Sequence, residues 1–277
     1  APDRDHWRAV VPEAAETIRA AQMAGDDFIV EYLKDAVTQV RLFRTDGTHV
    51  RDVDFPGLGT ASGFDGKRAS TEVYYSWNTF NTPPSVYRYD LGTGASTLWR
   101  RPETSFRPED YVVRQVFYAS KDGTRVPMFV AHRRNVKPDG NRPTLLTGYG
   151  GFRISLTPTF SPARLAWMEM GGVLAQPNLR GGGEYGEEWH RAGTGRNKQN
   201  VFDDFIAAAE YLVKERYASP TTLGIMGGSN GGLLVGAVME QRPDLFAVAL
   251  PAVGVMDMLR YHKFSGGAAW ATEYGSA

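Results

Sequence analysis

The sequence predicts two parts: an all-β part over residues 1–103 and an α/β part over residues 104–277, with a mostly parallel sheet and helices on both faces. Up to residue 103, short runs rich in Val, Tyr, Phe and Trp alternate with turn residues, a pattern typical of strands. From residue 144 onward, strand-like runs alternate with helix-like runs, which indicates a parallel sheet covered by helices. A polar, proline-containing passage over residues 101–110 separates the two patterns and predicts a boundary.

The all-β part contains two strand-turn units that can be laid over each other. The run 40–43 precedes Thr-Asp-Gly, and the run 86–89 precedes Leu-Gly-Thr-Gly. The two runs start 46 residues apart, at 40 and 86, which is close to the period of one four-stranded propeller blade. We therefore predict a partial β-propeller, and a β-sandwich with similar hairpins stays the alternative. The strands are expected at residues 28–33, 37–43, 73–77, 85–89 and 97–99.

The α/β part begins with a predicted hairpin, in which runs 111–118 and 126–131 flank Ser-Lys-Asp-Gly. Apolar residues at helical spacing predict one long helix, with Asn200 as its N-cap. A shorter helix is expected after Pro162 and another over residues 233–240. The remaining strands are expected at residues 144–147, 173–175, 222–226 and 247–250.

The chemistry is concentrated in the hexapeptide Gly-Gly-Ser-Asn-Gly-Gly at 227–232, between an expected strand and an expected helix. This is the pattern of a nucleophile elbow in an α/β-hydrolase, with no room for a Cβ at Gly227 and Gly231. Such a turn exposes the Ser229 hydroxyl and aims the N–H of Asn230 at an acyl oxyanion. A glycine-rich turn without chemistry is the alternative.

A second oxyanion donor is expected from the loop after the strand that ends at Thr147. That loop reads Gly-Tyr-Gly-Gly-Phe over residues 148–152, and Tyr149 offers a backbone N–H or a phenolic O–H. The alternative for Tyr149 is a core tyrosine on a tight turn. A further glycine cluster at 180–186 lacks the Gly-Lys-Ser/Thr of a phosphate loop, so we expect a close-packed or mobile loop near the site.

The general base and its acid have no convincing candidates. In this fold they follow the serine in the order acid, then histidine. After Ser229 the only histidine is His262 and the only aspartates are Asp244 and Asp257. Asp257 and His262 are too close in sequence to occupy the ends of two strands. We therefore expect both triad partners outside these 277 residues, and the earlier histidines to be surface or structural residues.

The composition excludes several kinds of site and gives no support to others. Lys and Arg balance Asp and Glu at 31 each, which gives no electrostatic argument for binding nucleic acid or an anionic membrane. The absence of cysteine excludes disulfides, thiol catalysis and thiolate metal sites. The sequence has no apolar run long enough to span a membrane. Because it opens Ala-Pro-Asp with neither Met nor a signal pattern, we interpret the chain as a possible fragment.

Five motifs in order resemble the prolyl oligopeptidase family: residues 149–152, 178–186, 227–232, 255–259 and 270–275. The resemblance covers essentially the whole chain and is strongest from Tyr111 to Gly275. It implies a seven-bladed propeller that caps an α/β-hydrolase domain and admits only short peptides. Residues 1–103 would be the C-terminal blades, and residues 104–277 the N-terminal part of the catalytic domain.

The resemblance also implies roles for individual residues. Ser229 would be the nucleophile, with the Asn230 N–H and the Tyr149 hydroxyl as oxyanion donors. The pocket for the substrate proline would be formed by Trp270, Phe152, Val255 and Tyr274, since an aromatic face in a dry slot selects a ring that has no N–H.

The implied activity is a serine endopeptidase that cuts short peptides on the carboxyl side of proline, without a metal or organic cofactor. A monomer is expected once the full chain is present, in the cytoplasm, with the periplasm as the alternative. Two other functions stay open: a related serine peptidase or esterase of other specificity, and a catalytically incomplete fragment that acts only with its missing C-terminal part.

Overall fold

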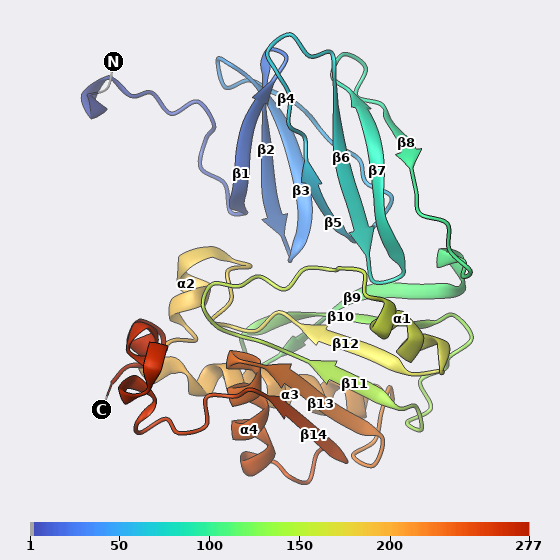
Figure 1. Ribbon diagram of the computed structural model, residues 1–277, viewed down its shortest axis with the longest axis vertical. Coiled ribbons are helices and arrows are strands. Elements are labelled where there is room, and N and C mark those ends of the chain that lie inside the picture. Colours follow the sequence, from blue (N-terminus) through green and yellow to red (C-terminus); the bar gives the residue numbers. More distant parts are fainter. Residues whose placement is uncertain (1–2, 277) are drawn as a thin grey trace.

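The computed structural model describes residues 3–276. These residues form two four-stranded sheets and one six-stranded sheet. The two four-stranded sheets stand side by side on top of the six-stranded sheet and its helices (Figure 1). The all-β and α/β parts therefore follow each other in the chain as the sequence predicts.

Each four-stranded sheet is antiparallel and keeps its strands in chain order, as in a propeller blade. The first consists of β1 (Thr17–Ala24), β2 (Asp27–Lys34), β3 (Val37–Arg44) and β4 (His49–Asp52). The second consists of β5 (Thr60–Gly63), β6 (Glu72–Thr79), β7 (Thr82–Asp90) and β8 (Ser96–Arg100). The two predicted repeat runs lie in β3 and β7, the third strand of each sheet. The sequence missed β1, which buries only one of its eight residues, and the short strands β4 and β5.

The two blades share one hydrophobic core, whose buried aromatic side chains lie within residues 64–89. Along β6, Val73, Tyr75 and Trp77 are buried, in step with the period of two of a strand. The Tyr75 ring stacks between Phe64, at a centroid distance of 4.6 Å, and Tyr87, at 5.3 Å. Such stacked pairs stabilise a core beyond the area that they bury. This packing explains the buried aromatic residues of β6 and β7.

The six-stranded sheet has the order β14-β13-β11-β12-β10-β9. The pairs β11–β12, β11–β13 and β13–β14 are parallel, whereas β9–β10 and β10–β12 are antiparallel. The prediction of a mostly parallel sheet after an initial hairpin is confirmed. The strands are β9 (Tyr111–Ala119), β10 (Arg125–Arg133), β11 (Thr144–Thr147), β12 (Val173–Pro177), β13 (Leu223–Gly228) and β14 (Val248–Ala252).

Helices cover both faces of this sheet. Side chains of α3 (Gln199–Lys214) and α4 (Asn230–Gln241) form one core with Met128 and Val130 of β10. The alternate residues Phe129 and Ala131 face α1 (Pro162–Glu169) and residues from the blades. Two short helices, α2 (Gly186–Arg191) and α5 (Ala271–Tyr274), lie near the carboxyl ends of the strands (Figure 1). Short 3-10 segments lie at Arg4–His6, Pro108–Asp110, Gly195–Asn197, Tyr261–Lys263 and Ser265–Trp270.

One detail of the long helix differs from the prediction. Helix α3 starts at Gln199, so Asn200 lies inside its first turn and is not the N-cap. The Asn200 amide instead donates to the Ala192 carbonyl at 2.9 Å, because the preceding chain returns close to the helix start. Local propensity for capping is therefore overridden here by a tertiary hydrogen bond.

The α/β part contacts the blades through the segment that follows residue 152. The Thr60 hydroxyl donates to the Pro158 carbonyl at 2.7 Å, and the Phe160 N–H donates to the Asn78 side chain at 2.9 Å. The Tyr185 hydroxyl donates to Asp35, in the turn between β2 and β3, at 2.6 Å. These bonds fix the loops at the carboxyl ends of the strands beneath the blades.

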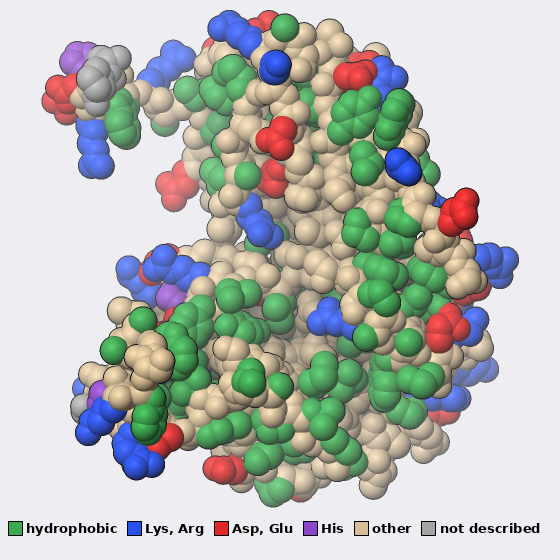
Figure 2. Space-filling view, viewed as in Figure 1, with side chains coloured by type: hydrophobic (Ala, Val, Ile, Leu, Met, Phe, Trp, Pro, Cys, Tyr) green, Lys and Arg blue, Asp and Glu red, His purple; other side chains and the backbone are tan. Residues whose placement is uncertain are grey.

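Strand β14 is the edge of the six-stranded sheet. Large apolar side chains are exposed on β14 and on the segment after it, and Figure 2 shows hydrophobic side chains over this half of the molecule. These exposed residues include Val248, Leu250, Val253, Met256 and Leu259. None of the helices in residues 3–276 is long and apolar enough to cross a membrane.

Candidate active site

Ser229 stands at the junction between β13 and α4 in a strained backbone conformation. Its φ of 58° and ψ of −119° lie outside the regions that non-glycine residues usually adopt. Such strain persists only where the surroundings impose it, and here the Ser229 N–H donates to the Ala252 carbonyl of β14 at 2.9 Å. The residue is exposed. The turn thus has the geometry of a nucleophile elbow, which presents the serine hydroxyl to solvent.

The glycines around Ser229 are required by close backbone contacts. A Cβ on Gly227 would lie 2.3 Å from the Gly231 carbonyl oxygen, and a Cβ on Gly231 would lie 2.6 Å from the Gly148 carbonyl oxygen. The crowding expected at Gly227 and Gly231 is therefore present. The second contact also places the elbow directly against the loop that begins at Gly148.

Tyr149 follows the end of β11 and brings its side chain to the elbow. Burial raises the pKa of its phenol, and a contact with the Ser229 hydroxyl partly opposes that shift. The phenol therefore keeps its proton at neutral pH and can donate it in a hydrogen bond. Asn230 opens α4, so its N–H is one of the donors that no residue of the helix can accept. Both expected oxyanion donors thus lie beside Ser229.

Two of the four expected pocket residues, Phe152 and Tyr274, lie beside these donors. The rings of Phe152 and Tyr274 meet edge to face at 5.6 Å, and the Tyr274 hydroxyl donates to the Asn230 side chain at 2.9 Å. Val255 is half-buried in the segment after β14, next to Gly254, which packs on the first turn of α4. Trp270 precedes α5 and is 37% exposed, and no aromatic pair recorded within residues 3–276 includes it.

No histidine of the described residues forms a hydrogen bond with Ser229. The Nε2 atom of His190 lies 2.9 Å from a carboxylate oxygen of Glu273, and Nδ1 of His132 lies 2.8 Å from the Arg133 carbonyl. His49 pairs with Asp52. Asp257 pairs with Arg260 rather than with His262. Within residues 3–276 there is also no group of three His, Asp or Glu side chains that could hold a metal ion.

Two buried residues next to the site were not among the site residues expected from the sequence. Lys198 and Glu273 lie beneath the loop 148–152, with side chains 12% and 4% exposed. Lys198 precedes the long helix in a polar run, and Glu273 lies between the expected pocket residues Trp270 and Tyr274. Only the position of Glu273 inside a recognisable motif could have indicated its importance.

The second glycine cluster packs against the loop 148–152, as the sequence suggested. A Cβ on Gly181 would lie 2.7 Å from the Gly150 carbonyl oxygen. The cluster begins at Arg180, which is buried and forms ion pairs at 2.6 Å with both Asp204 and Asp122. Through its hydrogen bonds, Arg180 lowers the pKa of Asp122 to about 2. This ion-pair cluster anchors the glycine-rich backbone under the site.

Comparisons with family models, known sequences and solved structures all indicate the same family. Residues 1–102 match a model described as the prolyl oligopeptidase N-terminal β-propeller domain, and residues 158–277 match the prolyl oligopeptidase family. A prolyl endopeptidase of Elizabethkingia miricola is 49% identical over 276 residues, which is 100% of this chain and 39% of that protein. The chain belongs to the prolyl oligopeptidase family. The blades are therefore part of a propeller, and the sandwich alternative is wrong.

Further prolyl oligopeptidase relatives share the fold. A prolyl endopeptidase of Dictyostelium discoideum is 39% identical over 97% of this chain and 36% of that protein. A solved prolyl endopeptidase structure superposes with a TM-score of 0.93 and 50% identity, covering 99% of this chain and 41% of its own. A post-proline cleaving enzyme from Rickettsia typhi gives a TM-score of 0.85 at 36% identity, covering 96% and 39% of the two chains. The chain thus spans about two fifths of the length of these relatives.

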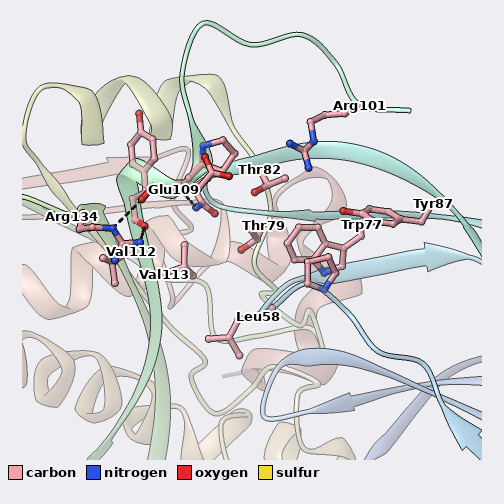
Figure 3. Close-up of a pocket in the computed structure, with 15 residues that line it drawn as sticks. Leu58, Trp77, Thr79, Thr82, Tyr87, Arg101, Glu109, Val112, Val113 and Arg134 are labelled. Carbon is pink, nitrogen blue, oxygen red and sulfur yellow. Dashed lines mark hydrogen bonds between the residues drawn. The ribbon is translucent and has the colours of Figure 1, made fainter. Parts of the chain in front are cut away.

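A separate pocket of this prolyl oligopeptidase chain lies at the junction of its two parts (Figure 3). It has a volume of 410 Å³ and lies between β6, β7 and the segment that enters β9. The Arg134 guanidinium, which lines it, donates to the backbone carbonyls of Glu109 and Tyr111. None of the residues expected at the active site lines this pocket. The candidate site is therefore defined by the strained elbow and not by this cavity.

Proposed function

We propose that the full-length protein is a serine endopeptidase that hydrolyses short peptides on the carboxyl side of proline. The observation that carries this proposal is the exposed, strained Ser229 with the Tyr149 phenol and the Asn230 N–H beside it. Membership of the prolyl oligopeptidase family supports the choice of peptide bonds over other acyl groups. No metal or organic cofactor takes part in the proposed reaction.

In the proposed reaction, the Ser229 oxygen attacks the carbonyl carbon of the proline residue and loses its proton to a general base. The negative charge that develops on the carbonyl oxygen accepts hydrogen bonds from the Asn230 N–H and the Tyr149 hydroxyl. The tetrahedral intermediate then expels the amine, which takes the proton from the base. Water, activated by the same base, hydrolyses the acyl-enzyme. We propose that this base lies outside residues 1–277, because no histidine described here contacts Ser229.

Specificity for proline would come from the aromatic residues next to the oxyanion donors. Phe152 and Tyr274 already present an edge-to-face pair, and Trp270 stays partly exposed and can stack on the flat substrate ring. Val255 would close the apolar wall. A pocket of this kind recognises a proline ring by shape, since the ring offers no N–H for a hydrogen bond.

The test is turnover of a chromogenic glycyl-prolyl peptide by the full-length protein, together with labelling by a fluorophosphonate, a reagent that modifies activated serines. We expect both reactions to occur and both to be abolished by Ser229→Ala. A glycyl-alanyl peptide serves as the control for specificity. Labelling without a preference for proline would favour a serine peptidase or esterase of other specificity, and labelling that survives Ser229→Ala would refute the assigned nucleophile.

The 277-residue chain by itself should show little turnover, because its described residues supply no base to Ser229. Substantial activity of this chain, lost in Ser229→Ala, would contradict that expectation. Activity that returns only on mixing with a complementary segment would support the proposal that catalysis requires both. We also propose that the full-length protein is monomeric, which sedimentation velocity tests directly.

A further inference from the structure

A buried polar cluster lies beside the oxyanion donors and makes hydrogen bonds to the loop 148–152 and to Asn230. It consists of Lys198, Glu273 and His190, whose side chains are 12%, 4% and 13% exposed. The three residues come from separate segments: the residue before α3, helix α5 and helix α2. Buried charges are stable only when they are paired, so each of these side chains must be held against a defined partner.

Lys198 ties the oxyanion loop to the nucleophile elbow. Its Nζ donates to the Gly150 carbonyl at 2.9 Å and to the Asn230 side-chain oxygen at 3.1 Å. A Glu273 carboxylate oxygen lies 3.8 Å from the same Nζ. The three N–H bonds of one ammonium group therefore face three partners, one on each segment that forms the site.

Glu273 holds the other end of the loop. One carboxylate oxygen accepts the Phe152 N–H at 2.9 Å, and the other faces Nε2 of His190 at 2.9 Å. The Arg153 guanidinium donates to Nδ1 of His190 at 3.1 Å, so Nε2 carries the proton that is donated to Glu273. Phe152 and Arg153 have φ values of 56° and 57°, a conformation that must be imposed by surrounding contacts. Glu273 provides one such contact at the Phe152 N–H, and the Arg153 N–H donates to the Gly181 carbonyl at 3.2 Å.

The side chain of Asn230 has a single possible orientation in this arrangement. Its oxygen accepts from Lys198 and from the Tyr274 hydroxyl, at 3.1 and 2.9 Å, and its nitrogen donates to the Tyr149 carbonyl at 2.6 Å. The loop also packs directly on this amide, since a Cβ on Gly151 would lie 2.6 Å from its nitrogen. The Tyr149 carbonyl and Gly151 are thus both held against the Asn230 amide. Because Asn230 follows Ser229 directly, this fixes the position of the loop around Tyr149 with respect to Ser229.

We propose that Lys198 and Glu273 form a positioning pair that holds the Tyr149 hydroxyl and the Asn230 N–H over Ser229 and links these donors to the helix that carries the proline pocket. This inference rests on the proposed function. The pair acts in the transition state, because a displaced donor weakens the bond to the developing oxyanion more than it weakens substrate binding. Helix α5 places Glu273 between Trp270 and Tyr274, so the same carboxylate serves both the donors and the pocket.

The charge of Lys198 makes this role testable by pH. Burial lowers the pKa of Lys198 to about 8, and the Glu273 carboxylate opposes the shift. The other groups that face its Nζ are the Asn230 amide of α4 and the Tyr274 ring of α5, with the cation 5.4 Å from the ring centroid. Beyond Glu273 lie His190 and, on the loop, Arg153. Below about pH 8 the ammonium pairs with Glu273, and above it the ion pair is lost, so activity should fall on the alkaline side.

The experiment compares Lys198→Met and Glu273→Gln with the parent in the full-length protein. Both kcat and KM for the glycyl-prolyl peptide are measured from about pH 6 to about pH 10. For Lys198→Met we expect kcat to fall about 10- to 100-fold, KM to stay within about threefold, and the alkaline decline to disappear. The matched control is Lys214→Met, which removes an exposed lysine from the C-terminal end of α3 and should leave the profile unchanged.

Glu273→Gln keeps the shape of the side chain and an acceptor for the Phe152 N–H, so it also carries the test if Lys198→Met fails to fold. Without the carboxylate charge, Lys198 should lose its proton more readily, and the alkaline decline should move to lower pH. In the double variant, kcat should be no lower than in the worse single variant, because the two residues act as one unit.

An unchanged kcat and an unchanged alkaline decline in Lys198→Met would overturn the positioning pair. A rise in KM at constant kcat would also overturn it, because the pair would then serve ground-state binding alone. A parent protein that turns over alanyl but not prolyl peptides would instead refute the proposed specificity, and the same kinetics on the alanyl peptide would still test the pair. If the parent cleaves neither peptide, the rate of fluorophosphonate labelling provides the comparison.

Discussion

The contact between the elbow and the oxyanion loop predicts a specific effect of Gly231→Ala. The new Cβ would lie 2.6 Å from the Gly148 carbonyl oxygen, whereas ordinary contact begins at 3.4 Å, so one segment must move by 0.8 Å. Gly148 cannot easily move away, because it is itself packed against Phe205 and Leu234. Overpacking costs up to about 3 kcal/mol, and alanine in a helix regains at most about 1 kcal/mol over glycine. We expect a net loss of about 2 kcal/mol in the free energy of unfolding.

The matched control is Gly228→Ala on the other side of Ser229. A Cβ there would meet only the Ala252 carbonyl oxygen at 3.9 Å, which is ordinary contact, so stability should change by less than about 0.5 kcal/mol. Urea unfolding of the full-length variants, followed by tryptophan fluorescence, measures both effects. In Gly231→Ala the displaced Tyr149 should also lower kcat by about 100-fold. A Gly231→Ala protein as stable as Gly228→Ala would refute the argument from backbone contact.

Three further predictions concern single side chains. Tyr149→Phe removes only the donor hydroxyl and should lower kcat about 10²- to 10³-fold in steady-state assays, with the melting temperature nearly unchanged; a kcat close to that of the parent would assign the oxyanion to other donors. Trp270→Ala should lower turnover of prolyl peptides far more than stability, and equal losses for prolyl and alanyl peptides would argue against stacking. Arg180→Met leaves Asp204 buried without its partner and should destabilise the protein by about 3–5 kcal/mol. Arg180 also lowers the pKa of Asp122 to about 2, so their pairing stabilises the parent above about pH 4 and is lost as the pH falls toward 2. The stability of Arg180→Met, measured by denaturation, should therefore depend less on pH in that range.

Much of the fold followed from local patterns. The strands with alternating or continuous apolar residues, such as β6, β11 and β13, were found near their observed positions, because one buried face dictates residue type at a period of two. Strands β1, β4 and β5 were missed, because β1 buries only one of its eight residues and the other two have four residues each. Local sequence carries little signal where pairing with a neighbouring strand, and not burial, defines the strand.

The sequence by itself determined the elbow and the glycine-rich loop, because both depend on backbone geometry that only glycine at fixed offsets permits. It could not determine which side chains stabilise that geometry. Phe152 and Glu273 are 121 residues apart in the chain, and Asn230 and Tyr149 are 81 apart, yet each pair forms a hydrogen bond. A lysine before a helix looks the same in sequence whether it is solvated or buried against a carboxylate. Only the tertiary structure decided that Lys198 is buried, because its partners come from three segments that the fold brings together.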